Sequence, residues 1–152
     1  MRLQIAYVSS RRDRLKSPAA HELVQDYVAR AARFLPTALQ SFRSEEELLA
    51  ASARQTGRVA AYSVLLDSRG KMLSSESFAE TLRHLRDSGT QEVLLAIGPP
   101  DGWSAPARNS ARLLLSLGPL TLPHELALVV LAEQTYRALT ILAGFPYHSG
   151  HE

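Results

Sequence analysis

Short apolar runs alternate with segments of helical periodicity along almost the whole chain. An apolar run of about four to eight residues that is bounded by turn residues is typical of a strand buried in a sheet. Runs of this kind predict strands at residues 3–8, 37–42, 59–66, 93–97 and 113–117. The third run ends in Asp67, and the chain is expected to turn at Gly70.

Helices are predicted between these strands, mainly from their capping residues. Ser17 and Pro18 provide an N-cap and a first-turn proline for a helix that ends near Phe34. The other helices have similar signals, which include the capping-box pattern of a Ser followed three residues later by a Glu. One helix is predicted from Ser44, with Glu47 in its capping box, to Gly57, and the next from Ser74 or Ser75 to Gly89. A short helix is predicted near Ala105 to Ser110, and the last from Pro123 to Ala143.

This alternation of strands and helices predicts an α/β fold with a mainly parallel sheet. The length of 152 residues fits one domain, and no repeat, linker or low-complexity tract divides it. In such folds, ligands bind at the loops that follow the carboxyl ends of the strands. Two irregular loops qualify, one at Gly98–Gly102 and one at Gly118–Pro123. Neither has the G-x-G-x-x-G spacing of a dinucleotide site.

The last helix is apolar on nearly all its faces. Glu133 and Arg137 are spaced as an i,i+4 ion pair within it. One small sheet cannot cover so many apolar faces. A second subunit is therefore expected to pack against the apolar faces that the sheet leaves exposed.

Composition narrows the class of protein further. The chain has 45% hydrophobic and 21% charged residues, a net charge of +2 and no cysteine, so disulfides and thiolate zinc sites are excluded. No apolar run is long enough to span a bilayer and no signal-peptide layout is present, which predicts a soluble cytoplasmic protein. Lys16 and Lys71 are the only lysines among 17 basic residues. The cluster of Arg11, Arg12 and Arg14 suits either RNA phosphates or a solvated loop.

Four ordered blocks resemble the RlmH family of SPOUT methyltransferases, and they extend over roughly residues 62–148. Within them, a loop resembles I-G-G-x-D/E-G, a helix resembles E-x-x-Y-R-A, and the tail has the P-Y-H ending. The first block is Leu66, Asp67, Arg69, Gly70, Lys71, Ser74, Ser75, Glu76, Phe78 and Ala79; the loop is Ile97, Gly98, Asp101 and Gly102. The later residues are Ser116, Leu117, Leu120, Thr121, Leu122, Pro123, His124 and Leu126, then Glu133, Tyr136, Arg137 and Ala138, then Pro146, Tyr147 and His148.

The resemblance implies a specific fold and reaction. Residues 1–152 would form a single SPOUT domain, a homodimer subunit with helices on both faces of the sheet and a C-terminal deep trefoil knot. The methyl donor would be S-adenosylmethionine (SAM), and no metal would be involved. The acceptor would be N3 of a pseudouridine in 23S ribosomal RNA, either as free RNA or in the assembled ribosome. The SAM site would consist of Leu66, Gly98, Leu117, Gly118, Pro119, Leu120, Thr121 and Leu122.

The resemblance also implies candidates for positioning the acceptor and removing its proton. These are His124, Tyr147 and His148, with Arg137 as structural or phosphate support. Each has a simpler interpretation: His124 can cap or pack at a helix start, Glu133 and Arg137 can form an intrahelical pair, and a chain end is often disordered.

Three departures from the family pattern support a second hypothesis. Pro99 replaces a glycine and removes a backbone N–H, Leu128 replaces an arginine, and Ser149 replaces a basic residue. They are consistent with a catalytically impaired SPOUT homologue that acts as a dimeric RNA- or ribosome-binding protein. A nucleotide-binding α/β protein unrelated to SPOUT enzymes is a third interpretation, which would leave the ordered blocks as coincidence.

Overall fold

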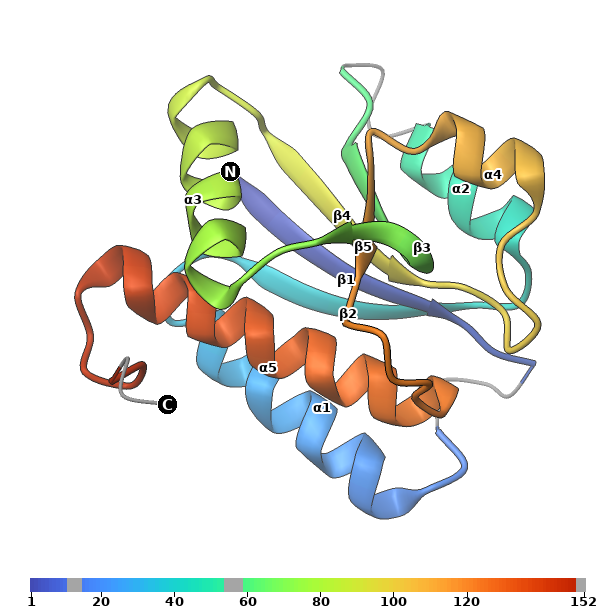
Figure 1. The fold of residues 1–152 in the computed structure, drawn as a ribbon, viewed down its shortest axis with the longest axis horizontal. Coiled ribbons are helices and arrows are strands. Elements are labelled where there is room, and N and C mark those ends of the chain that lie inside the picture. The colour runs from blue at the N-terminus through green and yellow to red at the C-terminus, as the bar shows by residue number, and fades with distance from the viewer. Residues whose placement is uncertain (11–14, 54–58, 150–152) are drawn as a thin grey trace.

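The computed structural model describes residues 1–10, 15–53 and 59–149. A parallel sheet of five strands forms its centre, in the order β2-β1-β4-β3-β5, so the predicted α/β class is confirmed (Figure 1). The strands are β1 (Arg2–Val8), β2 (Thr37–Phe42), β3 (Tyr62–Met72), β4 (Glu92–Ile97) and β5 (Leu113–Ser116). Every residue of β4 is buried, as expected for a strand that is covered on both faces.

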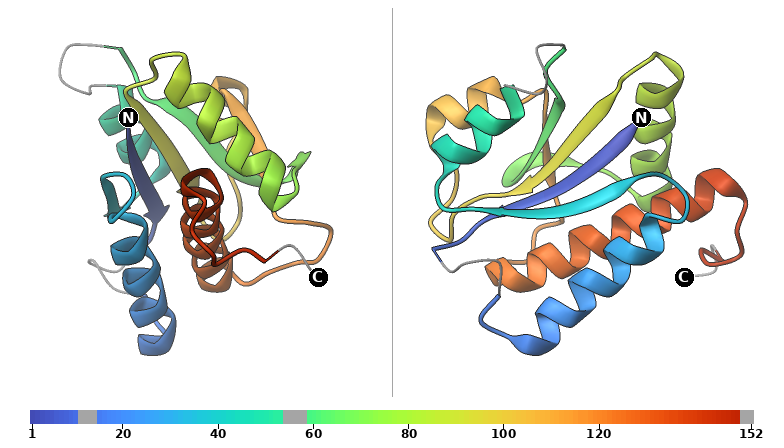
Figure 2. Two further views of the ribbon diagram at one scale, coloured as in Figure 1. Left: turned by 90° about the vertical axis from the view of Figure 1, so that its left-hand side faces the viewer. Right: turned by 180° about the vertical axis from the view of Figure 1, so that it is seen from behind.

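Helices cover both faces of the sheet. The helices are α1 (Pro18–Ala31), α2 (Glu45–Ala53), α3 (Ser75–Asp87), α4 (Ala105–Ser110) and α5 (His124–Ala143). Figure 2 shows α1 and α5 side by side along one face, where α3 also packs, whereas α2 and α4 lie on the other. Each face has its own apolar core, the larger one beneath α1, α3 and α5.

The predicted capping residues explain where the helices begin and end. The Ser17 hydroxyl accepts a hydrogen bond from the Ala20 N–H at the start of α1. At the start of α3 it is Ser74, rather than Ser75, that accepts from the Ser77 N–H. Helix α5 ends at Gly144, which takes the left-handed conformation at φ 68°. The predicted helix end at Gly57 lies outside the described residues.

Strand β3 differs from its prediction at both ends. It begins at Tyr62 rather than at Val59, whose side chain is 81% exposed. It does not turn at Gly70 but continues to Met72, with a shift in its pairing to β5 between Leu66 and Lys71. A Cβ on Gly70 would lie 2.6 Å from the backbone C and O of Leu114. The glycine therefore marks a close crossing of two strands, which an apolar pattern alone does not distinguish from a turn.

Helix α5 is the core helix of the larger layer. Among the described helices it alone is long and apolar enough to cross a membrane by composition, but much of that apolar surface is buried in the fold. Leu128 is fully buried on it. This departure from the family pattern therefore lies within the apolar core of the chain.

Candidate functional site

A cavity of about 430 Å³ lies at the carboxyl ends of β4 and β5, beside the middle of β3 where its pairing with β5 shifts. This is the edge of a parallel sheet where ligands usually bind. Its walls are residues 66–69 in the middle of β3, the loops that follow β4 and β5, and the start of α5. The volume falls within the range of small-molecule sites, which is roughly 300 to 1,000 Å³.

The structure brings the whole set of predicted SAM-binding residues to this one cavity. Leu66 comes from β3, Gly98 follows β4, and the others form the segment between β5 and α5. That segment is Leu117, Gly118, Pro119, Leu120, Thr121 and Leu122. The three segments meet because β3 lies between β4 and β5 in the sheet.

The loop after β4 is a tight turn with a buried tryptophan behind it. Gly102 donates from its N–H to the Pro99 carbonyl at 2.8 Å and has a φ of 93°, which favours glycine. Trp103 follows and is only 4% exposed. It lines the cavity but is not among the residues predicted from the sequence. The available signal was a single tryptophan directly after a glycine turn that ends a buried strand.

His124 is the one candidate catalytic residue that lines this cavity. Its Nε2 lies 2.7 Å from the carbonyl oxygen of Gly98. A carbonyl has no hydrogen to donate, so this contact requires the proton on Nε2. Nδ1 is then the ring nitrogen with a lone pair for an incoming proton. The contact also ties the start of α5 to the loop after β4.

The segment between β5 and α5 offers backbone donors to a ligand. The Ser116 hydroxyl accepts from the Gly118 N–H at 3.1 Å and holds the first bend. The N–H groups of Leu120, Thr121 and Leu122 have no hydrogen-bond partner within the described part of the chain. Backbone donors are normally satisfied, so these groups are available to a ligand or to water.

An ion pair sits on the β3 side of the cavity. Asp67 is nearly buried, with a side chain 5% exposed, and accepts from the N–H and the guanidinium of Arg69. Burial opposes ionisation of Asp67, but the hydrogen bonds from Arg69 outweigh it and hold the pKa of Asp67 below its ordinary value. The carboxylate thereby fixes the bulged part of β3 that borders the cavity.

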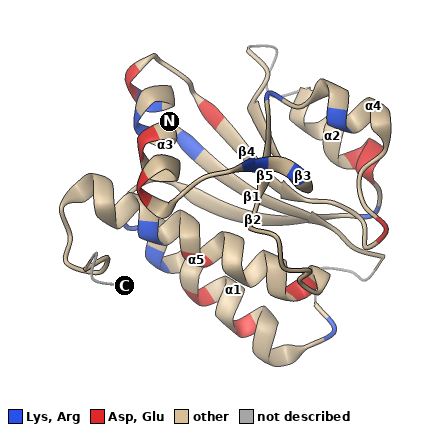
Figure 3. Cartoon of the chain, in the orientation of Figure 1, with Lys and Arg blue, Asp and Glu red and all other residues tan. Residues whose placement is uncertain are grey.

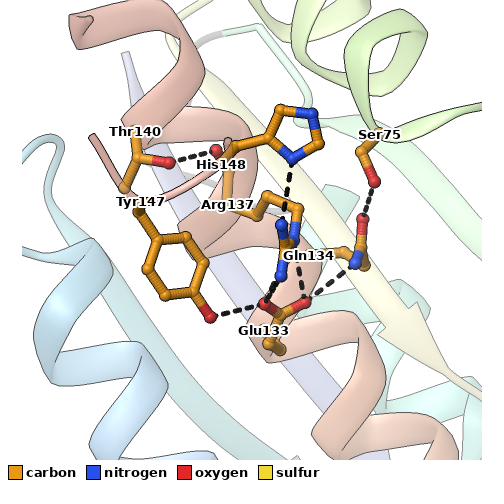
Figure 4. Close-up of polar contacts among 7 residues, drawn as sticks. All are labelled: Ser75, Glu133, Gln134, Arg137, Thr140, Tyr147 and His148. Carbon is orange, nitrogen blue, oxygen red and sulfur yellow. Dashed lines mark hydrogen bonds and ion pairs between the residues drawn. The ribbon is translucent and has the colours of Figure 1, made fainter. Parts of the chain in front are cut away.

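Tyr147 and His148 do not reach this cavity in their own chain. Figure 4 shows them docked on the far part of α5, where the Tyr147 hydroxyl donates to Glu133 at 2.7 Å. His148 Nδ1 lies 2.9 Å from an Arg137 nitrogen. Arg137 is thirteen residues beyond His124 on the same helix, which corresponds to about 20 Å.

Both ring nitrogens of His148 are engaged in this arrangement. Arg137 can only donate, so Nδ1 accepts, and the Nε2–H donates to Glu76 on α3 at 2.7 Å. Burial, followed by the hydrogen bond to Glu133, raises the pKa of Tyr147 above its ordinary value. Tyr147 is therefore protonated at neutral pH and acts as a donor. The predicted pair of Glu133 and Arg137 is present at 2.8 Å.

Charge is distributed rather than concentrated at the cavity. Figure 3 shows Lys and Arg on several elements, with acidic residues among them, and α5 largely without charge. Arg11, Arg12 and Arg14 lie outside the described residues. The segment that follows them is held near the cavity, because Glu125 on α5 accepts from the backbone N–H groups of Lys16 and Ser17.

Comparison with known proteins identifies relatives over nearly the full chain. Residues 1–148 match the model of a family described as predicted SPOUT methyltransferases. The ribosomal RNA large subunit methyltransferase H of Koribacter versatilis (strain Ellin345) is 44% identical over 151 residues, which cover 99% of this chain and 100% of the relative. The protein of the same name from Brucella ovis is 39% identical over 158 residues, with 89% and 94% covered.

Among solved structures, the fold is similar to the SpoU methyltransferase AviRb from Streptomyces viridochromogenes in complex with AdoMet. The TM-score is 0.46 at 15% identity, and the match covers 95% of this chain and 61% of that one. So distant a likeness does not locate a site.

Proposed function

The chain belongs to the SPOUT methyltransferase family, and we propose that it transfers a methyl group from SAM to N3 of a pseudouridine in 23S ribosomal RNA. The proposal covers the chain as a single SPOUT domain that acts in the cytoplasm, where the ribosomal substrate is found. The resemblance also implies a trefoil knot in the C-terminal half, which stays a prediction.

One observation carries the proposal: the residues expected to bind SAM line one cavity of suitable size. The cavity fits the ligand chemically as well. Adenine nitrogens and a carboxylate accept hydrogen bonds, and the N–H groups of Leu120, Thr121 and Leu122 are donors without a partner in the described chain. Bound SAM would supply an electrophilic methyl group on its sulfonium sulfur.

The residues around the cavity have separate roles in this proposal. Leu66, Gly98 and the segment from Leu117 to Leu122 hold the donor, largely through backbone groups. The acceptor N3 carries a proton that must leave, and His124 lines the cavity with Nδ1 as the ring nitrogen that the Gly98 carbonyl does not engage. His124 also positions the Gly98 loop through Nε2, so its two nitrogens serve different purposes.

We further propose that the protein acts as a homodimer in which the tail of one chain serves the cavity of the other. Tyr147 and His148 are docked on Glu133 and Arg137, which lie about 14 and 20 Å along α5 from His124, too far for a shared reaction centre within one chain. Apolar side chains remain exposed on neighbouring helices, with Leu23 on α1 at 45% and Leu126 on α5 at 47%. Exposed apolar surface of this kind is typical of subunit contacts.

The test of the reaction is titration of the purified protein with SAM by calorimetry, followed by methyl transfer to ribosomes from a strain that lacks its own RlmH-type enzyme. Binding with transfer is expected. The absence of binding at millimolar SAM would exclude the methyltransferase. Binding without transfer would favour the catalytically impaired, RNA- or ribosome-binding homologue. That alternative is based on Pro99, Leu128 and Ser149 in the sequence, and the engaged nitrogens of His148 are consistent with it.

The test of the shared site is co-expression of two inactive variants. Gly98→Val disrupts the cavity, because a side chain at this position would overlap the Trp103 indole, and His148→Ala removes the tail contact. A mixed dimer then contains one intact cavity served by one intact tail, so about a quarter of wild-type activity should return in a statistical mixture. No recovery would show that each tail acts on its own chain. Each variant expressed alone is the control.

A further inference from the structure

Trp103 borders the cavity and lies between Leu66 of β3 and Gly98, which follows β4. It follows Gly102 and directly precedes Ser104, the N-cap of α4. Its indole is 4% exposed and belongs to the apolar core on the α2 and α4 face. The loop that carries it is anchored on both sides. Arg108 donates to the Trp103 carbonyl at 2.6 Å, and the Ser104 N–H donates to Glu45 at 2.9 Å.

The indole contacts two of the proposed SAM-binding residues on neighbouring strands. Its Nε1–H donates to the Leu66 carbonyl at the end of the core part of β3, at 3.0 Å. Its ring lies against Gly98, the residue that follows β4, where a Cβ would be 2.7 Å from Cε2 and 2.8 Å from Cδ2. One rigid side chain therefore sets the position of both strand ends.

The close contact explains why residue 98 is a glycine. Gly98 is not among the glycines with positive φ, so its backbone conformation is open to other residues. The obstacle is the indole, which occupies the place of a side chain and cannot yield within a packed core. Removing the indole should therefore make a larger residue at position 98 acceptable.

We propose that Trp103 is a positioning residue for the methyl donor, which holds Leu66 and Gly98 in the arrangement that binds SAM. This proposal rests on the proposed function, since it concerns the same cavity. Trp103 acts through Leu66 and Gly98. Its removal should therefore lower the affinity for SAM more than it lowers kcat at saturating SAM.

The first test compares SAM affinity by calorimetry in the wild type and in Trp103→Phe. This variant keeps an aromatic ring and loses the N–H donor to Leu66. Its affinity should fall about threefold to tenfold, as expected for one hydrogen bond, and KM for SAM should rise while kcat at saturating SAM is retained. Phe42→Leu is the matched control. Phe42 belongs to the same core but does not line the cavity, so this change should lower the melting temperature and leave SAM affinity unchanged.

The second test uses the contact between Trp103 and Gly98. Gly98→Ala should weaken SAM binding strongly, and the double variant with Trp103→Leu should bind SAM more tightly than Gly98→Ala alone. A purely structural role predicts that the two changes add and that no affinity returns. Trp103 is the only tryptophan of the chain, so its emission in the wild type offers a second titration with SAM.

The outcomes separate this proposal from the function on which it rests. If the wild type fails to bind SAM, both are overturned. If the wild type binds SAM and Trp103→Phe binds it equally well, or if the double variant is no better than Gly98→Ala, only the role of Trp103 is overturned. Weaker binding by Trp103→Phe together with rescue by the double variant supports both.

Discussion

The Nε2 of His124 lies 2.7 Å from the carbonyl oxygen of Gly98, and this contact joins two segments that are 26 residues apart in sequence. One segment ends a buried strand and the other begins the longest helix. Both segments line the cavity, so the contact links the position of α5 to the loop after β4.

Replacing His124 by Ala should therefore weaken SAM binding as well as methyl transfer. The Gly98 carbonyl loses its donor, and the loop after β4 is no longer tied to α5. A buried acceptor left without its donor costs about 1 to 3 kcal/mol, which corresponds to roughly fivefold to a hundredfold in affinity. Calorimetry with SAM measures the change. His84→Ala is the control, because His84 is exposed on α3 and lies away from the cavity. Unchanged affinity in His124→Ala would show that the contact does not shape the site.

Gly70→Ala should destabilise the fold. A Cβ at this position would lie 2.6 Å from the Leu114 backbone, and neither strand can move without breaking its pairing. The free energy of unfolding should fall by about 1 to 3 kcal/mol or more, as for other overpacked sites, measured by urea denaturation. Ser68→Ala, two residues earlier on the same strand and exposed, should leave stability within about 0.5 kcal/mol. Equal stability of the two variants would contradict the close crossing.

The prediction from sequence succeeded where a local signal decides the structure. Ser17 and Ser74 cap helices through their own hydroxyls, and the buried strand at residues 93–97 has an uninterrupted apolar run. It failed at Gly70, because a glycine that permits a close crossing and a glycine that permits a turn look alike in sequence. Trp103 was missed for a related reason, since its partners Leu66 and Gly98 meet it only through the order of the strands.

Tyr147→Phe should loosen the docked tail. The variant loses the hydroxyl that donates to Glu133, and the expected loss of stability is about 0.5 to 1.5 kcal/mol. The pKa of Tyr147 is raised in the folded protein, so this contribution is present below the ordinary tyrosine pKa of about 10 and is lost as the pH rises through the raised value. Urea denaturation between pH 8 and 11, in the wild type and the variant, should show the difference between the two proteins beginning to narrow above about pH 10. Parallel curves would mean that the hydroxyl does not contribute.

Asp67→Asn should lower the stability of the fold at neutral pH, and the difference from the wild type should shrink at acid pH. The lowered pKa of Asp67 means that its ionised form stabilises the fold above about pH 4, and this contribution is lost as the pH falls through the lowered pKa. Arg69 is 63% exposed, so solvent screens the pair and the expected loss at pH 7 is about 1 kcal/mol. Asp101→Asn, on the exposed rim of the same cavity, is the control. A difference from wild type that persists undiminished at pH 3 would argue against the ion pair.

The position of β1 in the sheet has a consequence for the order of events during synthesis. β1 pairs on one side with β2, but its other neighbour is β4, in a register that places Arg2 beside Glu92. Arg2 and Glu92 are 90 positions apart, which corresponds to about 5 to 18 seconds of translation at ordinary elongation rates. During that interval a strand made largely of core residues has an open edge. The nascent chain is therefore expected to depend on shielding by β2 and α1, or by a chaperone, until its second half emerges.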